Sequence, residues 1–201
     1  MTIDHREEYE LASAAAARLR DEGFGDAVAA IQTGSGIPVP DLGGARSLTW
    51  TDIAGMPSAT APGHRGAVHH GTLAGAPVLV LEGRLHTYEG HCPAHVIRPV
   101  RAVGLAGAGC LILTNATGGV REGLAAGDLV RIVDHVNLMG VDPLAGPHDP
   151  RFGARFPVRH AARSSLRVPE RQLDPLTVRQ RPAPVSIGSV STRPGSGGST
   201  S

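Results

Sequence analysis

The chain has 201 residues, of which 41% are hydrophobic and only 3% are aromatic, so aliphatic and alanine side chains must build its core. The formal net charge of +1 excludes bulk attraction to nucleic acid or to a membrane surface. The N-terminus MTIDHREEYE has no apolar signal region, no apolar run could span a bilayer, and Cys92 and Cys110 form no CxxC pair, so we expect a cytoplasmic protein with reduced thiols.

The first half of the chain predicts one helix followed by strands. Residues 7–21, EEYELASAAAARLRD, are rich in Ala, begin with acids and end with bases, which is typical of a helix that Gly23 ends. Residues 26–36, DAVAAIQTGSG, indicate a strand that runs into a glycine turn. Residues 67–82 predict two strands joined by a turn at Ala74 and Gly75.

The pattern then alternates between helix and strand. Residues 93–107 have a helical composition, and Pro99 must either kink this helix or mark its true start. The run CLILTN, residues 110–115, predicts a short strand that is buried on both faces, as in a parallel sheet. Residues 128–138, DLVRIVDHVNL, predict another strand. This alternation indicates an α/β fold.

The composition changes after Pro157. Residues 158–201 hold no aromatic residue, two acids and seven arginines among many Ser and Pro. Such a segment lacks the apolar surface to offset its ordering entropy, so we predict that it is largely disordered. The chain is thereby divided into an N-terminal helix (1–23), a domain (24–157) and a tail (158–201).

Three stretches have the chemistry of an anion site. In TGSGI, residues 33–37, glycines let backbone N–H groups converge and Ser35 adds a hydroxyl. In GRLHTYEGH, Arg84 and His86 hold alternate positions of an extended segment and so point the same way. The run TNATGG, residues 114–119, follows a strand at its carboxyl end, where α/β sheets bind ligands. Singly, they are also typical of a plain turn, a surface ion pair and a loop, but together they suggest one bound oxyanion.

Other site chemistries have weaker support. The chain has no Lys, no GxxxxGK[ST] motif and no GxGxxG motif, so the anion is not a nucleotide polyphosphate in a standard loop. His91 and His95 have helical spacing and could bind metal together with His86, but HExxH is absent and solvated side chains are favoured. A triad of Ser35, His86 and an Asp lacks the GxSxG turn that would support it. We predict no metal site.

At this point the sequence resembles the trimeric purine nucleoside phosphorylases, a family that includes methylthioadenosine phosphorylases. The resemblance covers residues 24–157, and GRxHxYEG followed by TNAxGG is its most specific part. In order, the matching stretches are TGSGI, PGHRG, GRLHTYEGH, RPVRAVG, LTNATGGV, GDLVRIVDHVNL and DPRFGARFP.

The resemblance implies a fold and a reaction. The fold would be a single-domain nucleoside-phosphorylase-like α/β fold, with a central mixed β-sheet flanked by helices and its C-terminal part missing. The reaction would be phosphorolysis of the N-glycosidic bond of purine (deoxy)ribonucleosides, which yields a free purine base and (deoxy)ribose 1-phosphate in purine salvage. Inorganic phosphate would be the co-substrate, and no cofactor would be needed.

The resemblance also assigns roles to residues. Tyr88 would lie beside the ribose, and Asn115 would be a structural or sugar-side residue. Glu89 would orient His86 or share a proton with it, which makes these two the catalytic pair. Phe156 would reach the sugar pocket of a neighbouring subunit and so implies a homotrimer with shared active sites. The phosphate ligands would be Ser35, His64, Arg84, His86 and the backbone amide of Ala116.

The sequence departs from the family after residue 157, where the family's purine-binding motifs are not found. Our hypothesis is that the chain is a truncated or frameshifted phosphorylase. The alternatives are a non-catalytic phosphate-binding or oligomerisation remnant, a misfolded product without function, and, within the family, a methylthioadenosine phosphorylase.

Overall fold

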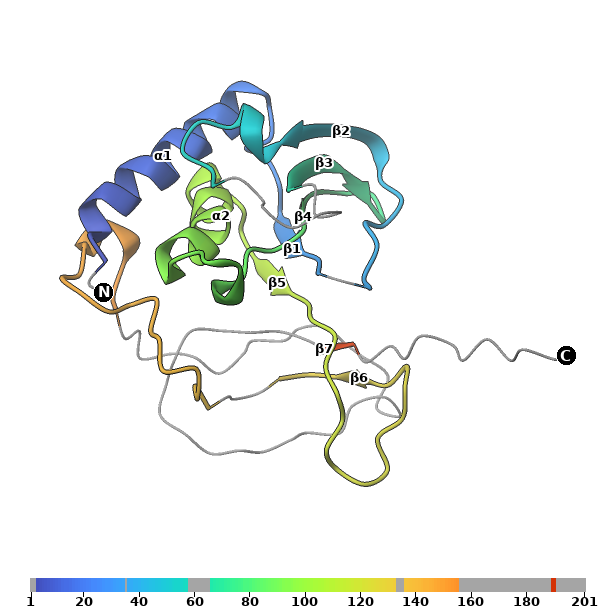
Figure 1. Cartoon of the computed structure of the whole chain (residues 1–201). Coiled ribbons are helices and arrows are strands. Elements are labelled where there is room, and N and C mark those ends of the chain that lie inside the picture. The colour runs from blue at the N-terminus through green and yellow to red at the C-terminus, as the bar shows by residue number, and fades with distance from the viewer. Residues whose placement is uncertain (1–2, 35, 58–65, 133–135, 156–188, 191–201) are drawn as a thin grey trace, which may run out of the picture.

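Two helices and a five-stranded sheet form the main body of the molecule (Figure 1). The computed structural model describes residues 3–34, 36–57, 66–132, 136–155 and 189–190. The helices are α1 (His5–Asp21) and α2 (Pro93–Ala106), with 3₁₀ turns η1 (Trp50–Asp52), η2 (Thr87–Glu89) and η3 (Pro150–Phe152). The strands are β1 (Ala29–Gln32), β2 (Gly43–Thr49), β3 (Ala67–Leu73), β4 (Ala76–Glu82), β5 (Leu111–Leu113), β6 (Leu129–Val130) and β7 (Ser189–Val190).

The main sheet is mixed, with the strand order β2-β3-β4-β1-β5. Strand β1 runs parallel to both β4 and β5, while β2, β3 and β4 form an antiparallel meander. Gln32, the last residue of β1, is in register with Leu81 on one side and Leu113 on the other. The α/β class and the mixed sheet are thus confirmed, and three strands end together at one edge.

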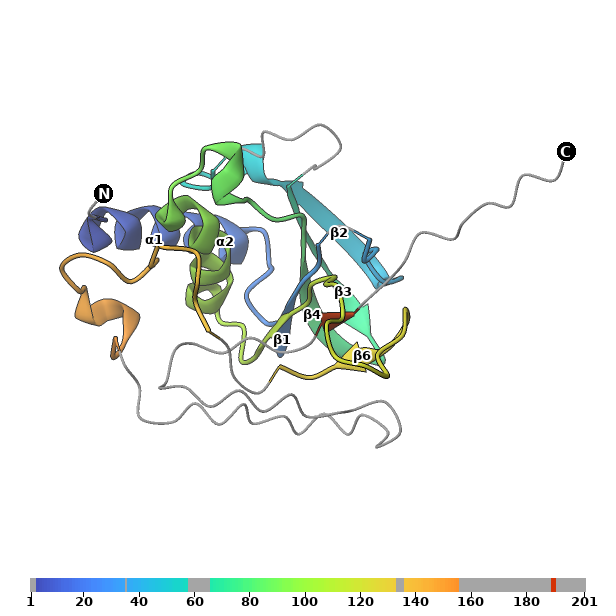
Figure 2. The same cartoon turned by 60° about the horizontal axis from the view of Figure 1, so that its bottom comes forward.

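Both helices lie on the same side of the sheet, as two views show (Figures 1 and 2). Leu79 and Leu81 of β4 point into the layer between sheet and helices, where they pack with Leu19, Phe24 and Trp50. These five side chains are at most 2% exposed. Burial of each large apolar side chain stabilises the fold by about 1.5–3 kcal/mol, so this layer is the main source of stability.

Helix α1 is capped at both ends by local residues. The Asp4 carboxylate accepts hydrogen bonds from the backbone N–H groups of Arg6 at 2.9 Å and Glu7 at 3.3 Å. Gly23, with a φ of 76°, ends the helix, and Phe24 N–H donates to the Leu19 carbonyl. The helix predicted over 7–21 is confirmed and begins two residues earlier, because its cap precedes the Ala-rich pattern.

Helix α2 runs through Pro99, which therefore does not mark its start. Pro93 stands at the first turn instead, where a missing N–H costs nothing. Pro99 cannot donate to the carbonyl of His95, yet its side chain is fully buried. Tertiary packing holds the helix across the position where its own hydrogen-bond ladder is interrupted.

The hairpin predicted over 67–82 is confirmed as β3 and β4, with Ala74 and Gly75 at positive φ in its turn. Strand β2 was not predicted, because GGARSLT is largely exposed and lacks alternation. Strand β5 is half-buried rather than buried on both faces, because it is the outer strand of the described sheet.

Two predictions fall wholly or partly outside the described residues. Of the strand predicted over 128–138, Leu129 and Val130 form β6, and residues 133–135 lie outside. The tail predicted to be disordered lies outside apart from β7, which pairs with β6. The domain boundaries at residues 23 and 157 stay predictions.

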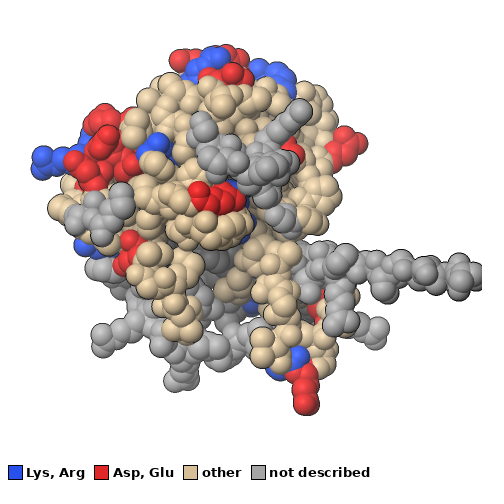
Figure 3. Space-filling view, viewed as in Figure 1, with Lys and Arg blue, Asp and Glu red and all other residues tan. Residues whose placement is uncertain are grey.

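The surface carries charges of both signs. In Figure 3, acidic and basic side chains are intermingled over α1 and at the top of the molecule, which fits the near-neutral net charge. Within the part of the chain that the structure describes, neither helix has the length and apolarity needed to cross a membrane.

Candidate active site

The ends of β1, β4 and β5 meet at one edge of the sheet. Thr33 N–H donates to the Leu81 carbonyl at 3.0 Å, and Thr114 N–H donates to the Gln32 carbonyl at 3.1 Å. The Thr114 hydroxyl also donates to the Gln32 carbonyl, at 2.9 Å. These bonds bring the segments TGSGI, GRLHTYEGH and TNATGG together, as the strand-end pattern predicted.

Arg84 lies at this meeting point. One of its terminal N–H groups donates to the Thr114 carbonyl. Its guanidinium also lies close to Gly34, where an added Cβ would stand 3.7 Å from the nearer terminal nitrogen. Burial lowers the pKa of Arg84 from its ordinary value, because the charged form loses solvation. A half-buried cation is thus held between two of the three strand ends.

The Arg84 side chain has a donor left over. Its Nε–H is buried and, among the described residues, has no hydrogen-bond acceptor. A buried donor on a charged group is costly when it stays unpaired, so such atoms are rare in folded proteins and call for an explanation. An oxyanion at the strand ends would satisfy both the charge and the donor.

His86 and Glu89 close the short turn η2 on each other. The His86 side chain accepts from the Glu89 backbone N–H, and the Glu89 carboxylate accepts from the His86 backbone N–H at 3.4 Å. Gly90 leaves the turn at a φ of 89°, a conformation that favours glycine. This reciprocal cap holds the His86 side chain at the start of the turn η2, two residues after Arg84 in the chain.

Tyr88 projects from the same turn. Its ring stacks on the His86 ring, with centroids 4.8 Å apart and planes 14° apart. The residue is nevertheless 80% exposed, so one face of the phenol is available to a ligand. An apolar ring of this kind suits a sugar or a base better than it suits an ion.

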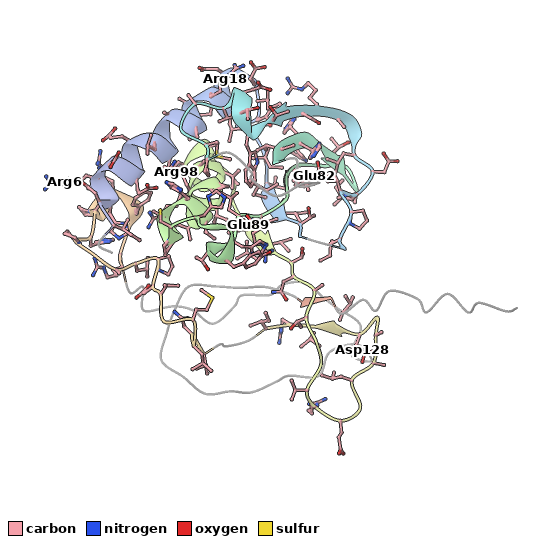
Figure 4. All side chains as sticks on the ribbon, viewed as in Figure 1. Arg6, Arg18, Glu82, Glu89, Arg98 and Asp128 are labelled. Atoms are coloured by element: carbon pink, nitrogen blue, oxygen red, sulfur yellow. The ribbon has the colours of Figure 1, made fainter. Side chains whose placement is uncertain are left out.

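Glu89, which Figure 4 labels, carries a shielded carboxylate. The Glu89 side chain is 10% exposed, and its Oε2 lies 3.8 Å from Nε2 of His91. The His91 ring meets the His95 ring edge to face at 6.1 Å. Burial, with the charge of Arg98 second, lowers the pKa of His95. The His91 side chain is only 11% exposed, so the prediction of a solvated side chain was wrong for His91.

The remaining predicted residues divide into two groups. Asn115 is half-buried and Ala116 exposed, and both directly follow Thr114 at the strand ends. Ser35, His64 and Phe156 lie outside the described residues, so their roles stay predictions. Sequence reasoning missed the Thr114 carbonyl as the partner of Arg84, since only the register of β1 and β5 brings it there.

The geometry favours an anion site over a metal site. Over the described ranges, no group of three or more His, Cys, Asp or Glu side chains could hold a metal ion. The strand ends instead offer the Arg84 guanidinium, the His86 ring and the glycine-rich turns. This arrangement can bind an oxyanion beside a stacked aromatic pair.

Comparison with known sequences finds phosphorylases, which agrees with an oxyanion site. The sequence profile of the Phosphorylase superfamily matches residues 29–195, and so extends into the tail. Purine nucleoside phosphorylase 1 of Bacillus subtilis is 44% identical over 125 residues, which are 62% of this chain and 46% of that protein. Purine nucleoside phosphorylase of Mycobacterium bovis is 40% identical over 170 residues, 83% of this chain and 61% of that protein.

Comparison with solved structures agrees. Purine nucleoside phosphorylase of Schistosoma mansoni in complex with inosine matches with a TM-score of 0.68 and 33% identity, covering 74% of this chain and 53% of that one. The chain spans about half the length of curated relatives such as the Bacillus subtilis protein.

Proposed function

The chain belongs to the Phosphorylase superfamily, and from this membership we propose that it catalyses the phosphorolysis of purine nucleosides in purine salvage. The products would be a free purine base and (deoxy)ribose 1-phosphate, with inorganic phosphate as the co-substrate and no resident cofactor. Relatives named purine nucleoside phosphorylase support the substrate class, and a relative solved with inosine supports a nucleoside at this fold.

The observation that carries the proposal is the half-buried Arg84, whose Nε–H has no acceptor among the described residues. The planar guanidinium fork matches phosphate, and charge-assisted hydrogen bonds to it are stronger than neutral ones. We assign Arg84 to the phosphate together with His86, whose ring the turn η2 holds nearby. Ser35, His64 and the Ala116 amide complete the proposed phosphate site.

The nucleoside would lie on the exposed side of the same site. The open face of Tyr88 suits the ribose, and Asn115 stands at the end of β5 on the sugar side. Phe156 would enter from a neighbouring subunit, which makes a homotrimer part of the proposal. Glu89 would act through His86, because its carboxylate accepts from the His86 backbone and so holds the turn.

The chemistry follows from where the phosphate is held. A phosphate oxygen attacks the anomeric carbon, and the bond from that carbon to the purine nitrogen breaks. Positive charge develops on the ribose in the transition state, and a phosphate dianion held by Arg84 and His86 stabilises that charge. The same dianion is already positioned to attack the anomeric carbon. Positioning and electrostatics of this kind can supply most of the rate acceleration.

Release of purine base from inosine and guanosine, with and without phosphate, tests the proposal on the 201-residue chain. We expect release only with phosphate and its loss in Arg84→Ala. The matched control is Arg18→Ala, which removes a half-exposed arginine that pairs with Glu22 at the C-terminal end of α1 and should leave the rate unchanged.

The outcomes separate the alternatives. Phosphate that raises the unfolding temperature without any base release would leave a phosphate-binding module in place of an enzyme. No release and no stabilisation by phosphate would overturn both. Release that is faster from methylthioadenosine than from inosine would favour the methylthioadenosine branch.

A further inference from the structure

Three polar side chains form a hydrogen-bonded row across β2, β3 and β4. The Ser47 Oγ lies 2.7 Å from Nδ1 of His69, and Nε2 of His69 lies 2.8 Å from Oε2 of Glu82. Figure 4 labels Glu82 at the end of β4. None of these three side chains belongs to the proposed phosphate site.

The strand register explains why the row forms. Ser47 stands directly opposite His69, and Glu82 stands opposite Ala67, one step along the same face. Trp50 N–H donates to the Gly66 carbonyl at 2.8 Å, which makes that pair a hydrogen-bonded one. By alternation Ser47 and His69 form a non-hydrogen-bonded pair, where side chains approach most closely.

The partners fix the tautomer of His69. An ionised Glu82 carboxylate can only accept a hydrogen bond, so Nε2 of neutral His69 carries the proton. Nδ1 therefore has a free lone pair and accepts the hydroxyl proton of Ser47. A hydroxyl bonded to an imidazole that a carboxylate orients is the arrangement that activates a serine nucleophile.

The Ser47 hydroxyl, the nucleophile of this row, is accessible to solvent and to a substrate. Ser47 is exposed, while the His69 side chain is 18% exposed and so largely shielded. Strand β2 is the outer strand of the described sheet. In a non-hydrogen-bonded pair the backbone N–H points away from the partner strand, so Ser47 N–H faces outward from β3 and can donate to a developing oxyanion.

We propose that Ser47, His69 and Glu82 form a nucleophilic site for small activated carboxylic esters, such as aryl esters, independent of the phosphate site. The Ser47 Oγ attacks the ester carbonyl carbon, and its proton passes to Nδ1 of His69. The bond to the leaving oxygen then breaks, and His69 returns the proton to that oxygen. Water releases the acid from Ser47 by the same proton transfers.

His70 supplies a matched control on the next residue. It points to the opposite face, where its Nε2 lies 2.9 Å from Asp26 and its Nδ1 lies 3.5 Å from the Arg46 guanidinium. This histidine also stands beside a carboxylate, but its second ring nitrogen meets a cation and not a hydroxyl. A His70 variant therefore measures how much ester hydrolysis an imidazole on this sheet catalyses without a bonded hydroxyl.

The test uses p-nitrophenyl acetate with the full chain, measuring p-nitrophenol release and the acetylated peptide by mass spectrometry. Positioned general bases contribute about 10²–10⁴-fold to rate, so Ser47→Ala and His69→Gln should each lower release at least about tenfold. His70→Gln, and Cys110→Ser, which removes an exposed thiol, should stay within about twofold of the parent chain.

The acetyl group should map to Ser47 in the unsubstituted chain. Because the acetyl group is mapped in the unsubstituted chain, this measurement tests the proposal even if a variant fails to fold. An adduct confined to other residues, or an unchanged rate in a folded Ser47→Ala variant, would overturn the proposal and leave the row as a cross-strand hydrogen-bond network.

Discussion

The interface between the two helices holds a buried arginine, Arg98, and the edge where the strands end holds a half-buried one, Arg84. The two differ in how many of their nitrogens are paired. Each nitrogen of Arg98, which lies on α2 and is labelled in Figure 4, donates a hydrogen bond. Nε donates to Glu8 at 2.9 Å, one terminal nitrogen to Glu8 at 2.6 Å, and the other to the Gly55 carbonyl at 2.9 Å. Arg84 donates to the Thr114 carbonyl, but its buried Nε–H has no acceptor among the described residues.

This difference separates a structural role from a binding role. Every nitrogen of the buried Arg98 guanidinium already donates to a protein acceptor and its charge is paired with Glu8, so Arg98 serves to join α2 to α1 and to the turn at Gly55. A buried cation with a spare donor costs the free protein stability and regains it when an anion arrives. The same substitution should therefore affect a different property at each position: folding stability at Arg98 and ligand binding at Arg84.

The largest expected effect is on folding at Arg98. Arg98→Ala leaves the Glu8 carboxylate, 9% exposed, without its partner, and should lower the free energy of unfolding by about 3–5 kcal/mol. Urea unfolding measures this change. Replacing both partners with Leu should recover much of the loss, whereas equal losses in the single and double variants would argue against an unpaired buried charge as the cause.

A smaller effect, on ligand binding, is expected at Arg84. Arg84→Ala should weaken phosphate binding by about 1.5–3 kcal/mol, the contribution of a hydrogen bond to a charged group, with little change in unfolding. Calorimetric titration with phosphate measures the affinity. Unchanged affinity in a folded variant would remove Arg84 from the phosphate site and erase the contrast with Arg98.

The smallest expected effect concerns a third arginine, Arg151, which pairs with Asp149. Hydrogen bonds from the Arg151 guanidinium lower the pKa of Asp149 to about 2. Because the folded value is below the unfolded value of about 3.9, the stabilisation is present above about pH 4 and is lost as pH falls through about 2.

Thermal unfolding between pH 5 and pH 2 measures this contribution. Asp149→Asn should lose less stability over this window than the parent chain does, whereas Asp41→Asn, at an exposed site, should follow the parent. Parallel curves for Asp149→Asn and the parent would mean that this pair adds nothing to acid sensitivity.

The sequence predicted the elements whose signals are local. Residues 7–21 and the hairpin turn at Ala74 and Gly75 carry their own helix and turn chemistry, and both were confirmed. Strand β2 was missed because its formation depends on pairing with β3 and not on its own pattern. Pro99 was expected either to kink the helix or to mark its start, and the structure rules out the second alternative, because α2 begins at Pro93 and continues through the buried Pro99.

In the candidate site, too, local features were predicted from the sequence and features that depend on strand register were missed. Arg84 and the segment after β5 were placed together because strand ends in a parallel sheet meet, and Thr114 confirms that reasoning. The bond from Arg84 to a carbonyl, the reciprocal cap of His86 and Glu89, and the row beginning at Ser47 all depend on register between distant residues. One sequence gives residue types and local spacing, but register comes from the assembled sheet.

The most direct test of the account follows the Nε–H signals of the two buried arginines by NMR while inorganic phosphate is added. The account predicts that the Arg84 Nε–H signal shifts with phosphate concentration, because that donor gains an acceptor, while the Arg98 signal stays in place. Phosphate binding that leaves the Arg84 signal unmoved would contradict the claim that its unpaired donor marks the phosphate site.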